Sequence, residues 1–320
     1  MSLEKVVQCI KENKRFLITS HVNLEGDALG SELACFKLLR RKKKQVVILN
    51  QDKVPAEYNF LPHIKEIKNK IQNFSFDAAI ILDCSDFSRC GRVRELFSAD
   101  KITINIDHHI SNNNFADINW VEPSCSSTAE MIYHLYKKLC VPLDKDSALD
   151  LYTGILTDTG SFRYANTNYR THLVVAQLLK TGVLPEVVYK NIYQSHAFDD
   201  VKLLTRVFPL IRRDREGKLV WFSIPKKILK KSSVSFDLTE AVLAFGRQIK
   251  GVEVVVLFKE NLGQANQIKV NLRSQGKYDV NRIASFFGGG GHRTASACTL
   301  NGNLNDVCKK VLRKIKESLY

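Results

Sequence analysis

The chain has 320 residues, of which 44% are hydrophobic and 25% charged, an ordinary composition for a folded globular protein and a length that suits two domains. Lys and Arg number 48 against 33 Asp and Glu, so the formal net charge is +15. This excess favours a polyanionic partner such as a nucleotide, a nucleic acid or a membrane surface; a generally lysine-rich surface is the alternative.

Two classes of protein are disfavoured by the sequence. No apolar run approaches the roughly 18 residues that a membrane helix needs. The start, "MSLEKVVQCIKENKRF", alternates charged and apolar residues and lacks the pattern of a secretion signal. We therefore expect a cytoplasmic protein with no membrane partner. The eight cysteines include no CxxC pair, which predicts reduced thiols, mostly in the core.

In chain order, the first half alternates short apolar runs with segments of helical period, which is typical of a parallel sheet with crossover helices. Each run is rich in Ile, Val and Leu on both sides of the pleat, as expected for strands covered on both faces. The expected strands are 15–20, 45–50, 78–83 and 101–106.

Helical segments follow from about residue 125, where Ser126, Ser127 or Thr128 with Glu130 would cap a helix. Strand-like runs return after the charged "IRRDREGK". The predicted fold class is α/β: an N-terminal domain (1–195) with a mostly parallel sheet flanked by helices, a connector (196–215) and a smaller α+β domain (216–320) across a cleft.

Acids and histidines gather where the apolar runs of the first domain stop. In open parallel sheets, ligands bind at the carboxyl ends of strands. A single acid at such a place is unremarkable, because Asp often begins a turn. Here the pattern recurs after three strands and once more in "GILTDTGSF"; the residues are His21, Glu25, Asp27, Asp83, Asp107, His108, His109 and Asp158.

Crowded carboxylates repel each other, and a cation between them makes the crowding tolerable. A set of Asp, Glu and His without cysteine suits Mn²⁺ or Mg²⁺ better than a structural zinc ion. Two such ions roughly 3.5 to 4 Å apart, bridged by a carboxylate and a water, hydrolyse phosphoesters. The sequence therefore predicts metal-dependent hydrolysis of an anionic phosphoester.

A second cluster is the glycine run in "FGGGGHRTAS". Consecutive glycines let the backbone approach a ligand and turn N–H groups toward phosphate, although a flexible loop is the default interpretation. Arg273 and Ser274 end a strand-like run. At that position their side chains could contact a phosphate or base together with this loop. The predicted substrate-binding residues are Arg273, Ser274, Gly288, Gly289, Gly290, Gly291 and His292.

Five motifs in this order, "HVNLEGDALGS", "ILDCSD", "NIDHH", "GILTDTGSF" and "FGGGGHRTASA", resemble those of the DHH phosphoesterase superfamily with a C-terminal DHHA1 domain. The resemblance covers nearly the whole chain. The length is similar to that of the stand-alone bacterial oligoribonuclease and pAp-phosphatase type, the NrnA-like branch, where pAp is 3′-phosphoadenosine 5′-phosphate.

The resemblance implies a role for each residue of the cluster. Two divalent ions, Mn²⁺ in the first place and Mg²⁺ as the alternative, would share Asp83 as a bridge. The implied ligands are His21, Glu25 and Asp83 for one ion, and Asp27, Asp83, His108 and Asp158 for the other. Asp107 would orient the histidines and His109 would face the phosphate, so Asp83, Asp107, His108 and His109 form the implied catalytic set.

The chain departs from the family at Glu25, where the usual motif has Asp in "DGD" and this sequence has "EGD". Glutamate has the same charge and one more methylene, so we expect it to remain a ligand with altered geometry. Arg273 and the run from Gly288 to His292 would grip the terminal nucleotide or phosphate of the substrate.

The resemblance implies a Mn²⁺-dependent phosphodiesterase or exoribonuclease that degrades short oligoribonucleotides (nanoRNA) and removes the 3′-phosphate of pAp. One alternative is a cyclic dinucleotide or pNpN phosphodiesterase. An alternative of another class is a catalytically silent nucleotide- or RNA-binding protein. A processive exonuclease of the RecJ type and a family II pyrophosphatase fit the chain less well. The expected partners are short RNA or a small nucleotide, and the resemblance makes a homodimer reasonable.

Overall fold

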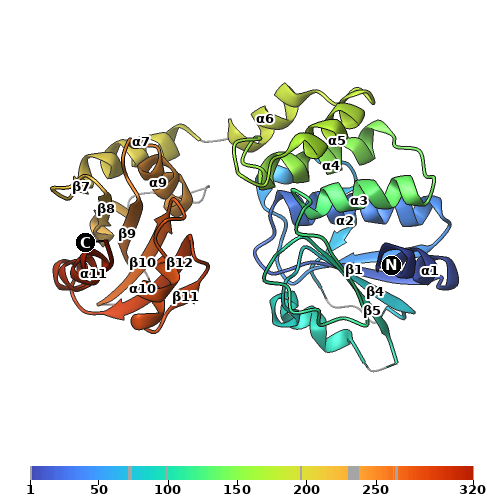
Figure 1. Ribbon diagram of the computed structural model, residues 1–320, viewed down its shortest axis with the longest axis horizontal. Helices are drawn as coiled ribbons and strands as arrows, with labels where there is room; N and C mark the ends of the chain where they lie inside the picture. The colour runs from blue at the N-terminus through green and yellow to red at the C-terminus, as the bar shows by residue number, and fades with distance from the viewer. Residues whose placement is uncertain are drawn as a thin grey trace. The chain divides into compact units, whose positions relative to one another are not determined.

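The computed structural model describes residues 2–70, 74–98, 100–194, 197–229, 238–261, 263 and 266–319. The chain divides into two compact units, Met1–Ser195 and His196–Tyr320 (Figure 1). The predicted domain boundary at 195 falls on residues outside the described ranges, so it stays a prediction. None of the helices in the described ranges combines the length and apolarity needed to cross a membrane.

The first unit is built on a six-stranded sheet in which every strand pair is parallel. The strand order is β3-β2-β1-β4-β5-β6. The strands are β1 (Arg15–Thr19), β2 (Gln45–Leu49), β3 (Ile67–Lys68), β4 (Ala78–Leu82), β5 (Ile102–Asp107) and β6 (Ile118–Val121). The four strands expected from the sequence are confirmed within a residue at each end, and the short β3 and β6 are additions.

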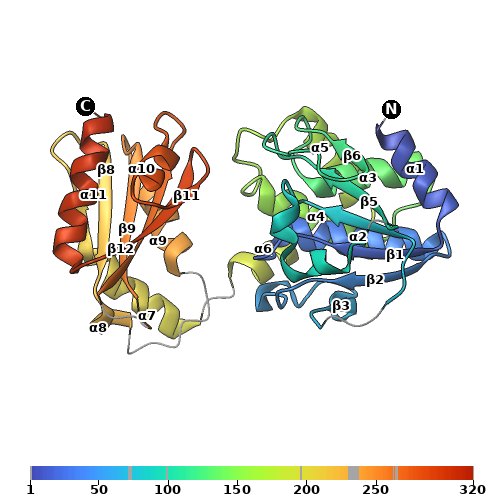
Figure 2. The same ribbon diagram turned by 90° about the horizontal axis from the view of Figure 1, so that it is seen from below.

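Helices cover one face of this sheet together with the 3-10 segments around Tyr58 and Ile64, and the 3-10 segment around Val93 covers the other face with irregular chain (Figure 2). The helices are α1 (Ser2–Glu12), α2 (Gly26–Arg41), α3 (Thr128–Lys138), α4 (Lys145–Asp158), α5 (Tyr169–Leu179) and α6 (Pro185–Tyr193). The 3-10 segments are η1 (Ala56–Tyr58), η2 (Ile64–Glu66) and η3 (Phe87–Leu96). Ile18 packs into the core beneath the helices, whereas its neighbour Leu17 points to the other face and shares a cluster with Val93 of η3. Both sides of the pleat are therefore buried, as the runs of Ile, Val and Leu predict.

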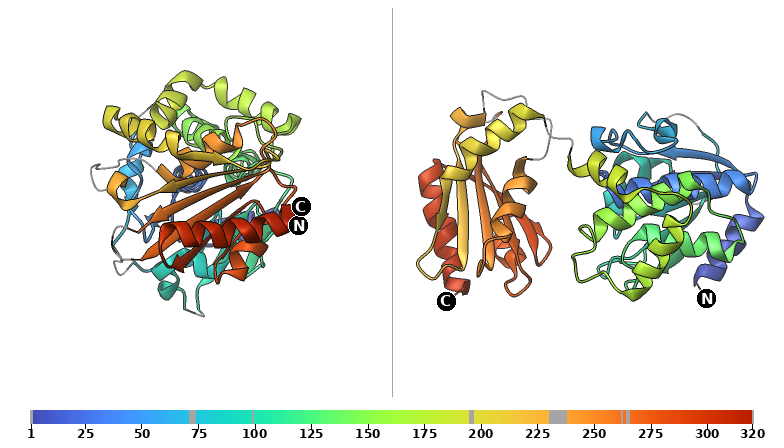
Figure 3. Two further views of the ribbon diagram at one scale, coloured as in Figure 1. Left: turned by 90° about the vertical axis from the view of Figure 1, so that its left-hand side faces the viewer. Right: turned by 90° about the horizontal axis from the view of Figure 1, so that it is seen from above.

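The second unit has a mixed six-stranded sheet of order β11-β12-β10-β9-β8-β7, in which only β8 and β9 pair in parallel. Its strands are β7 (Ile211–Arg213), β8 (Leu219–Ile224), β9 (Val254–Glu260), β10 (Gln267–Ser274), β11 (Gly290–Gly291) and β12 (Ala295–Asn301). Its helices are α7 (Phe198–Val207), η4 (Phe208–Leu210), α8 (Lys226–Leu229), α9 (Leu238–Arg247), α10 (Val280–Phe286) and α11 (Leu304–Leu319). Alternate residues of β9 face two cores: Val256 packs with α10 and α11, and Val255 packs with α7 and α9. Figure 3 shows α11 along one face of this sheet.

The segment 196–215, predicted as a connector, differs from that expectation. It contains α7, η4 and β7, and Leu203 and Val207 of α7 are buried in the core of the second unit. The apolar side of an amphipathic helix is stabilised by such burial, so this helix packs as part of the unit. The cysteines are all free, and each of them except Cys140 is buried.

Candidate metal centre

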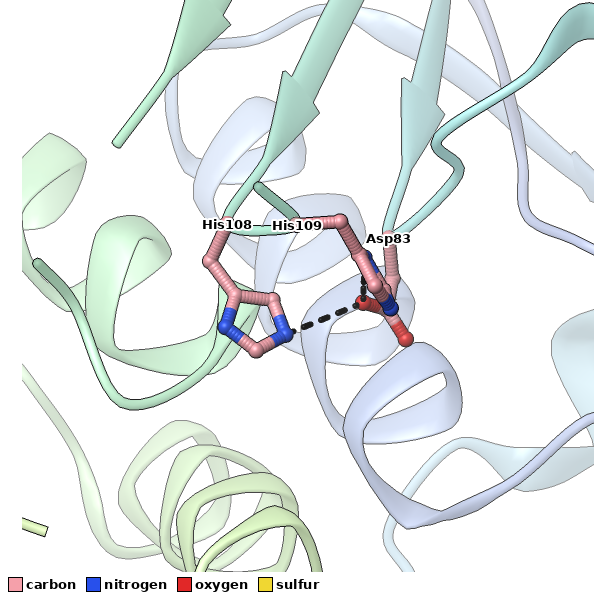
Figure 4. A group of neighbouring side chains, drawn as sticks. All are labelled: Asp83, His108 and His109. Carbon is pink, nitrogen blue, oxygen red and sulfur yellow. Dashed lines mark ion pairs between the residues drawn. The ribbon is translucent and has the colours of Figure 1, made fainter. Parts of the chain in front are cut away.

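The acids and histidines singled out in the first unit lie at the point where the strand order reverses. The chain leaves β1 toward β2 on one side of the sheet, whereas β4 is followed by β5 on the other side. Diverging connections of this kind leave a crevice at the carboxyl ends of the two central strands. His21 follows β1, Asp83 follows β4, and Asp107 ends β5. Figure 4 shows Asp83 with His108 and His109 from the adjacent strand end.

Asp83 lies at the middle of the group. Its backbone has a left-handed φ of 54°, which Asp tolerates better than most residues, and its side chain is buried. Its Oδ2 lies 3.4 Å from Nε2 of His21, and its Oδ1 lies 3.7 Å from both Nε2 of His108 and Nδ1 of His109. One carboxylate therefore faces three imidazoles.

Asp27, in the first turn of α2, is held by the first turn of α3. Its Oδ2 accepts a hydrogen bond from the backbone N–H of Thr128 at 2.7 Å, and its Oδ1 accepts one from Ala129 at 2.8 Å. The Thr128 hydroxyl also donates to Asp83 Oδ1 at 3.2 Å. A helix N-terminus favours negative charge, so these contacts hold the Asp27 carboxyl group in place and partly oppose the rise in its pKa. The sequence indicated Thr128 only as a cap; in the structure Ser127 caps α3.

The predicted ligand side chains meet in groups whose ligand atoms all lie within 4.8 Å of one another. The groups are His21, Glu25 and Asp83; Asp27, His108 and Asp158; and Asp83, His108 and His109. Within them, His21 Nε2 lies 3.7 Å from Glu25 Oε1, and His108 Nε2 lies 3.5 Å from Asp158 Oδ2. These separations are too long for good hydrogen bonds but suit two ligands of one cation.

Two asparagines that the sequence did not single out hold acids of the site. Asp107 Oδ1 pairs with His109 Nδ1 at 2.7 Å, and its Oδ2 accepts a hydrogen bond from Asn112 at 2.6 Å. Asn166 donates to Asp158 Oδ2 at 3.1 Å. Asn112 stands three residues after His109 in "HHISN", so its proximity in sequence was the one available signal.

The site is strongly perturbed electrostatically. Burial, helped by repulsion from Asp83 and Glu25, raises the pKa of Asp158 to about 8. Burial alone would raise the pKa of Asp83, but the neighbouring histidines, His21 first, lower it below its usual value. Burial likewise opposes charge on His109, yet Asp107 and Asp83 raise its pKa to about 9. Like charges held this close together are the usual sign of a functional site.

The donor set fits a divalent cation on two further observations. Nε2 of His21 and Nε2 of His108 are buried and have no hydrogen-bond partner among the described residues. An unpartnered buried nitrogen is costly, and coordination to a metal would satisfy it. The pKa of Asp27 is raised by burial and by repulsion from Asp83 and Asp158, which a cation between them would relieve.

The predicted substrate-binding residues lie in the second unit. Arg273 donates from Nη2 to Glu240 Oε2 of α9 at 2.8 Å, so its guanidinium is held beside the end of β10. Ser274 differs from expectation: it is buried, and its hydroxyl donates to the Tyr278 carbonyl at 2.7 Å. The turn after β10 thus uses this hydroxyl, which leaves Ser274 outside the surface that a ligand could touch.

The glycine run has a packing reason that the sequence did not reveal. Gly290 and Gly291 form the edge strand β11 against β12, and a Cβ at Gly289 would come within 2.2 Å of the Ala297 carbonyl oxygen. Gly288 and Gly291 have positive φ values of 74° and 143°. The glycines therefore let this edge approach β12 closely. The run and His292 after it are largely exposed.

Comparisons with known proteins agree with this architecture. Residues 15–155 match the model of the DHH family, N-terminal domain, and residues 225–317 match that of the DHHA1 domain. The chain is 30% identical over 94% of its length to the bifunctional oligoribonuclease and PAP phosphatase NrnA of Thermus thermophilus, covering 89% of that protein. It is 25% identical to the NrnA of Bacillus subtilis, with 92% of each chain covered.

Among solved structures, an exopolyphosphatase-related protein from Bacteroides fragilis superimposes with a TM-score of 0.91 at 26% identity, covering 99% of this chain and 96% of that one. The ordered motifs, the two matched domains and the relatives of nearly equal extent agree with one another. The chain therefore belongs to the DHH family, with an N-terminal DHH domain and a C-terminal DHHA1 domain, in its NrnA-like branch.

Proposed function

We propose that the protein is a divalent-metal-dependent phosphoesterase that hydrolyses short oligoribonucleotides and the 3′-phosphate of pAp. The observation that carries this proposal is the gathering of His21, Asp83, His108 and their acidic neighbours around unpartnered histidine nitrogens. The names of the NrnA relatives, bifunctional oligoribonuclease and PAP phosphatase, supply the substrate class. The net charge of +15 suits an anionic substrate.

Two overlapping sets of ligands would hold the metal ions. His21, Glu25 and Asp83 would bind one ion; Asp27, Asp83, His108 and Asp158 would bind the other. When bound, a pair of divalent cations activates a water molecule and neutralises charge on the phosphoryl oxygens. Mn²⁺ is the proposed ion, because oxygen and imidazole donors without thiolate suit it.

His109 has a distinct proposed role. Its Nδ1 pairs with the buried Asp107, which fixes the ring and leaves Nε2 for another partner. Burial opposes charge on the ring, but Asp107 and Asp83 raise its pKa to about 9, which favours a proton on Nε2. We propose that Nε2 donates a hydrogen bond to a phosphoryl oxygen of the substrate. Asn112 steadies the Asp107 carboxylate that orients this ring.

Substrate binding is proposed for the second unit. Arg273 would bind a terminal phosphate, and the exposed backbone of Gly288 to Gly291 with His292 would contact the nucleotide. Ser274 has no part in this proposal because its hydroxyl is buried. The homodimer and the cytoplasmic location stay predictions of the sequence.

The test is a comparison of four substrates with purified protein and Mn²⁺: a short RNA, pAp, cyclic di-AMP and pApA. We expect the RNA and pAp to be hydrolysed with the highest kcat/KM, and Asp83→Asn to abolish turnover of both. A preference for cyclic di-AMP or pApA would favour the cyclic dinucleotide alternative. Equal inactivity of the wild type and Asp83→Asn on all four would refute the proposal.

A matched pair of variants tests the division of roles. His108→Ala should abolish turnover because it removes a metal ligand, whereas Arg273→Ala should chiefly raise KM because it removes a phosphate contact. The opposite pattern would contradict the assignment of chemistry to the first unit and binding to the second.

A further inference from the structure

A second group of metal-type side chains lies at the start of α3, and the proposed function does not use it. Cys125 precedes the helix, and Glu130 and His134 are one turn apart on it, so their side chains share a face. Their ligand atoms all lie within 4.8 Å of one another. The three residues line a pocket of about 820 Å³ in the first unit.

The carboxylate of Glu130 divides its two oxygens between different tasks. Oε2 accepts hydrogen bonds from the Ser126 backbone at 3.1 Å, from the Ser126 hydroxyl at 2.5 Å and from the Thr171 hydroxyl at 3.1 Å. Oε1 takes no hydrogen bond within the part of the chain that the structure describes, and it lies 4.0 Å from Nε2 of His134. These three hydrogen bonds therefore account for one oxygen of this buried side chain and leave the other on the side of His134.

The spacing of these atoms suits a cation better than a hydrogen bond. At 4.0 Å, Oε1 and Nε2 are too far apart to share a proton. Two ligands of a tetrahedral zinc ion, each about 2.0 to 2.3 Å from the metal, lie roughly 3.3 to 3.8 Å apart. Small rotations of the half-exposed His134 ring would close that difference.

We propose that Cys125, Glu130 and His134 form a second cation site, of the Zn²⁺ type, separate from the candidate metal centre. Thiolate, imidazole and carboxylate together are the donors that zinc prefers, whereas the groups around Asp83 contain no thiol. Three protein ligands leave a fourth position, and the pocket gives a water molecule or an external ligand access to it. The chemistry is therefore distinct from that of the Asp and His groups.

The charges around the pocket permit a cation. Lys137, Lys138 and Arg170 line it, and the carboxylates of Glu4, Glu122 and Glu130 in the same lining balance their charge. Lys138 pairs directly with Glu4 at 3.1 Å. Burial lowers the pKa of His134, which keeps the imidazole in the neutral form that binds metal. Burial and the carboxylates of Glu130 and Glu122 raise the pKa of Cys125 to about 12, so binding would release the thiol proton to solvent.

Occupation of this site would affect the candidate metal centre through α3. Ser126 and Glu130 flank Thr128, whose N–H and hydroxyl bind Asp27 and Asp83. A cation that ties Cys125 to the first two turns of α3 would steady those donors. A cation at this second site would thus stabilise the N-terminal end of α3, which holds the proposed ligands Asp27 and Asp83.

Cobalt(II) supplies the test, because a thiolate ligand gives Co²⁺ a near-ultraviolet charge-transfer band that oxygen and imidazole ligands do not. We expect the full-length protein under reducing conditions to develop this band on Co²⁺ titration and Zn²⁺ to displace it. Cys125→Ser should lose the band, and His134→Gln should weaken Co²⁺ binding at this site by tenfold or more. Cys140→Ser, which removes the exposed cysteine, should keep the band and is the matched control.

Absence of the band in the wild type, or an unchanged band in Cys125→Ser, would overturn the proposal. Circular dichroism spectra of all three variants show whether each has folded, and His134→Gln, at a half-exposed side chain, keeps the test valid if Cys125→Ser does not fold. The readout does not depend on hydrolysis, so failure of the proposed function would leave it interpretable.

Discussion

Glu25 differs from the other acids of the candidate metal centre in its exposure: 58% of its side chain is accessible, whereas Asp27 and Asp83 are buried. It also occupies the N-cap position of α2 without a side-chain capping hydrogen bond. The side chain is therefore held by neither packing nor the helix end. This freedom is consistent with a ligand that moves into place when a cation arrives.

Exchange of Glu25→Asp should leave the rate of pAp hydrolysis equal or raise it by a factor of about three or less. Aspartate keeps the charge, and the shorter side chain has fewer rotamers to order. The measurement is kcat as a function of Mn²⁺ concentration. A complete loss of activity would show that the extra methylene has a role of its own.

Asn112→Ala should lower kcat by roughly 10- to 150-fold, with a smaller effect on KM, because loss of one hydrogen bond to a charged group costs roughly 1.5 to 3 kcal/mol. The Asn112 amide donates to Asp107 Oδ2, whose other oxygen orients His109. Steady-state kinetics on pAp provide the measurement. The control is Asn113→Ala, which removes an exposed contact with Asp86 and should leave kcat near the wild-type value.

At the scale of residues, the sequence singled out the charged residues of the candidate metal centre but not the polar residues that hydrogen-bond to them. His21, Asp83 and His108 stand out because acids and histidines at strand ends are few and chemically distinctive. Thr128 and Asn112 are ordinary polar residues, and the sequence marks them only by a possible helix cap and by proximity to the histidine pair. Their roles arise only when α3 and the segment after β5 are brought against the centre.

At the scale of elements, α2 and α4 approach so closely that their contact depends on glycine. A Cβ at Gly30 would lie 2.3 Å from the Asp150 carbonyl oxygen, and one at Gly154 would lie 2.8 Å from Asp27 Oδ1. Real Cβ atoms do not come within 3.0 Å of such atoms, so a methyl group at Gly30 would push α2 and α4 apart and one at Gly154 would displace Asp27 or Ala129. The placement of Asp27 thus rests on this helix contact.

Gly30→Ala should lower the free energy of unfolding by about 1 to 3 kcal/mol, the usual cost of overpacking a core. Denaturant titration followed by circular dichroism measures the change. Gly290→Ala, where a Cβ meets open space, is the comparison and should change stability by much less. Equal effects of the two substitutions would contradict the close packing of α2 and α4.

The start of β1 is tied to the start of β4 by Asp77. The guanidinium of Arg15 and the N–H groups of Lys14 and Arg15 donate to its carboxylate. The Arg15 hydrogen bond, acting against a small burial effect, lowers the pKa of Asp77 to about 2. An acid with a depressed pKa stabilises the fold above its unfolded pKa of about 3.9 and loses that contribution as pH falls toward the folded value.

Asp77→Asn should therefore lower Tm at neutral pH, and the difference from the wild type should shrink as pH falls from about 4 to about 2. Thermal unfolding at a series of pH values is the measurement. The pKa of Asp86 is also lowered, chiefly by hydrogen bonds from Ser88, so Asp86→Asn should show the same trend and serves as a comparison without the Arg15 pair. A Tm difference that is constant across this pH range would rule out the ion pair as its cause.

Among the elements, strands formed by long apolar runs could be predicted from the sequence, whereas the shortest strands could not. The expected strands of 78–83 and 101–106 correspond to β4 and β5, whose positions are confirmed. β3 has two residues and β6 has four, lengths at which periodicity carries no signal. The segment 196–215, which runs into the charged "IRRDREGK", was predicted as a connector, yet its β7 pairs with β8 and its α7 packs in the core of the second unit.

The whole molecule carries a formal charge of +15, and its proposed substrates are polyanions. Salt shortens the Debye length from about 10 Å at 0.1 M to about 3 Å at 1 M. We expect kcat/KM for short RNA to fall steadily with NaCl concentration, mainly through KM, and by more for a pentanucleotide than for pAp. Equal salt dependence for the two substrates would show that the charge acts on solubility alone.

At this scale the fold class was predictable because each half of the chain has its own pattern. Alternation of buried runs and helices specified the parallel sheet of the first unit, and the return of strands specified the mixed sheet of the second. The parallel pairing of β8 with β9 was not predicted; α8 and α9 lie between these strands in the chain and form part of the crossover that parallel strands need. Such pairings depend on contacts between residues far apart in sequence.

The side chains around Asp83 all come from one unit, whereas Arg273 and the glycine edge strand belong to the other. Each sheet has its own core, so substitutions near β10 and β12 leave the packing beneath β1 and β4 untouched. Under the proposed division of roles, descendants of this chain would acquire a new nucleotide preference through changes in the second sheet while inheriting the same hydrolytic chemistry. In such an architecture, the nucleotide preference would change in evolution while the hydrolytic reaction stays the same.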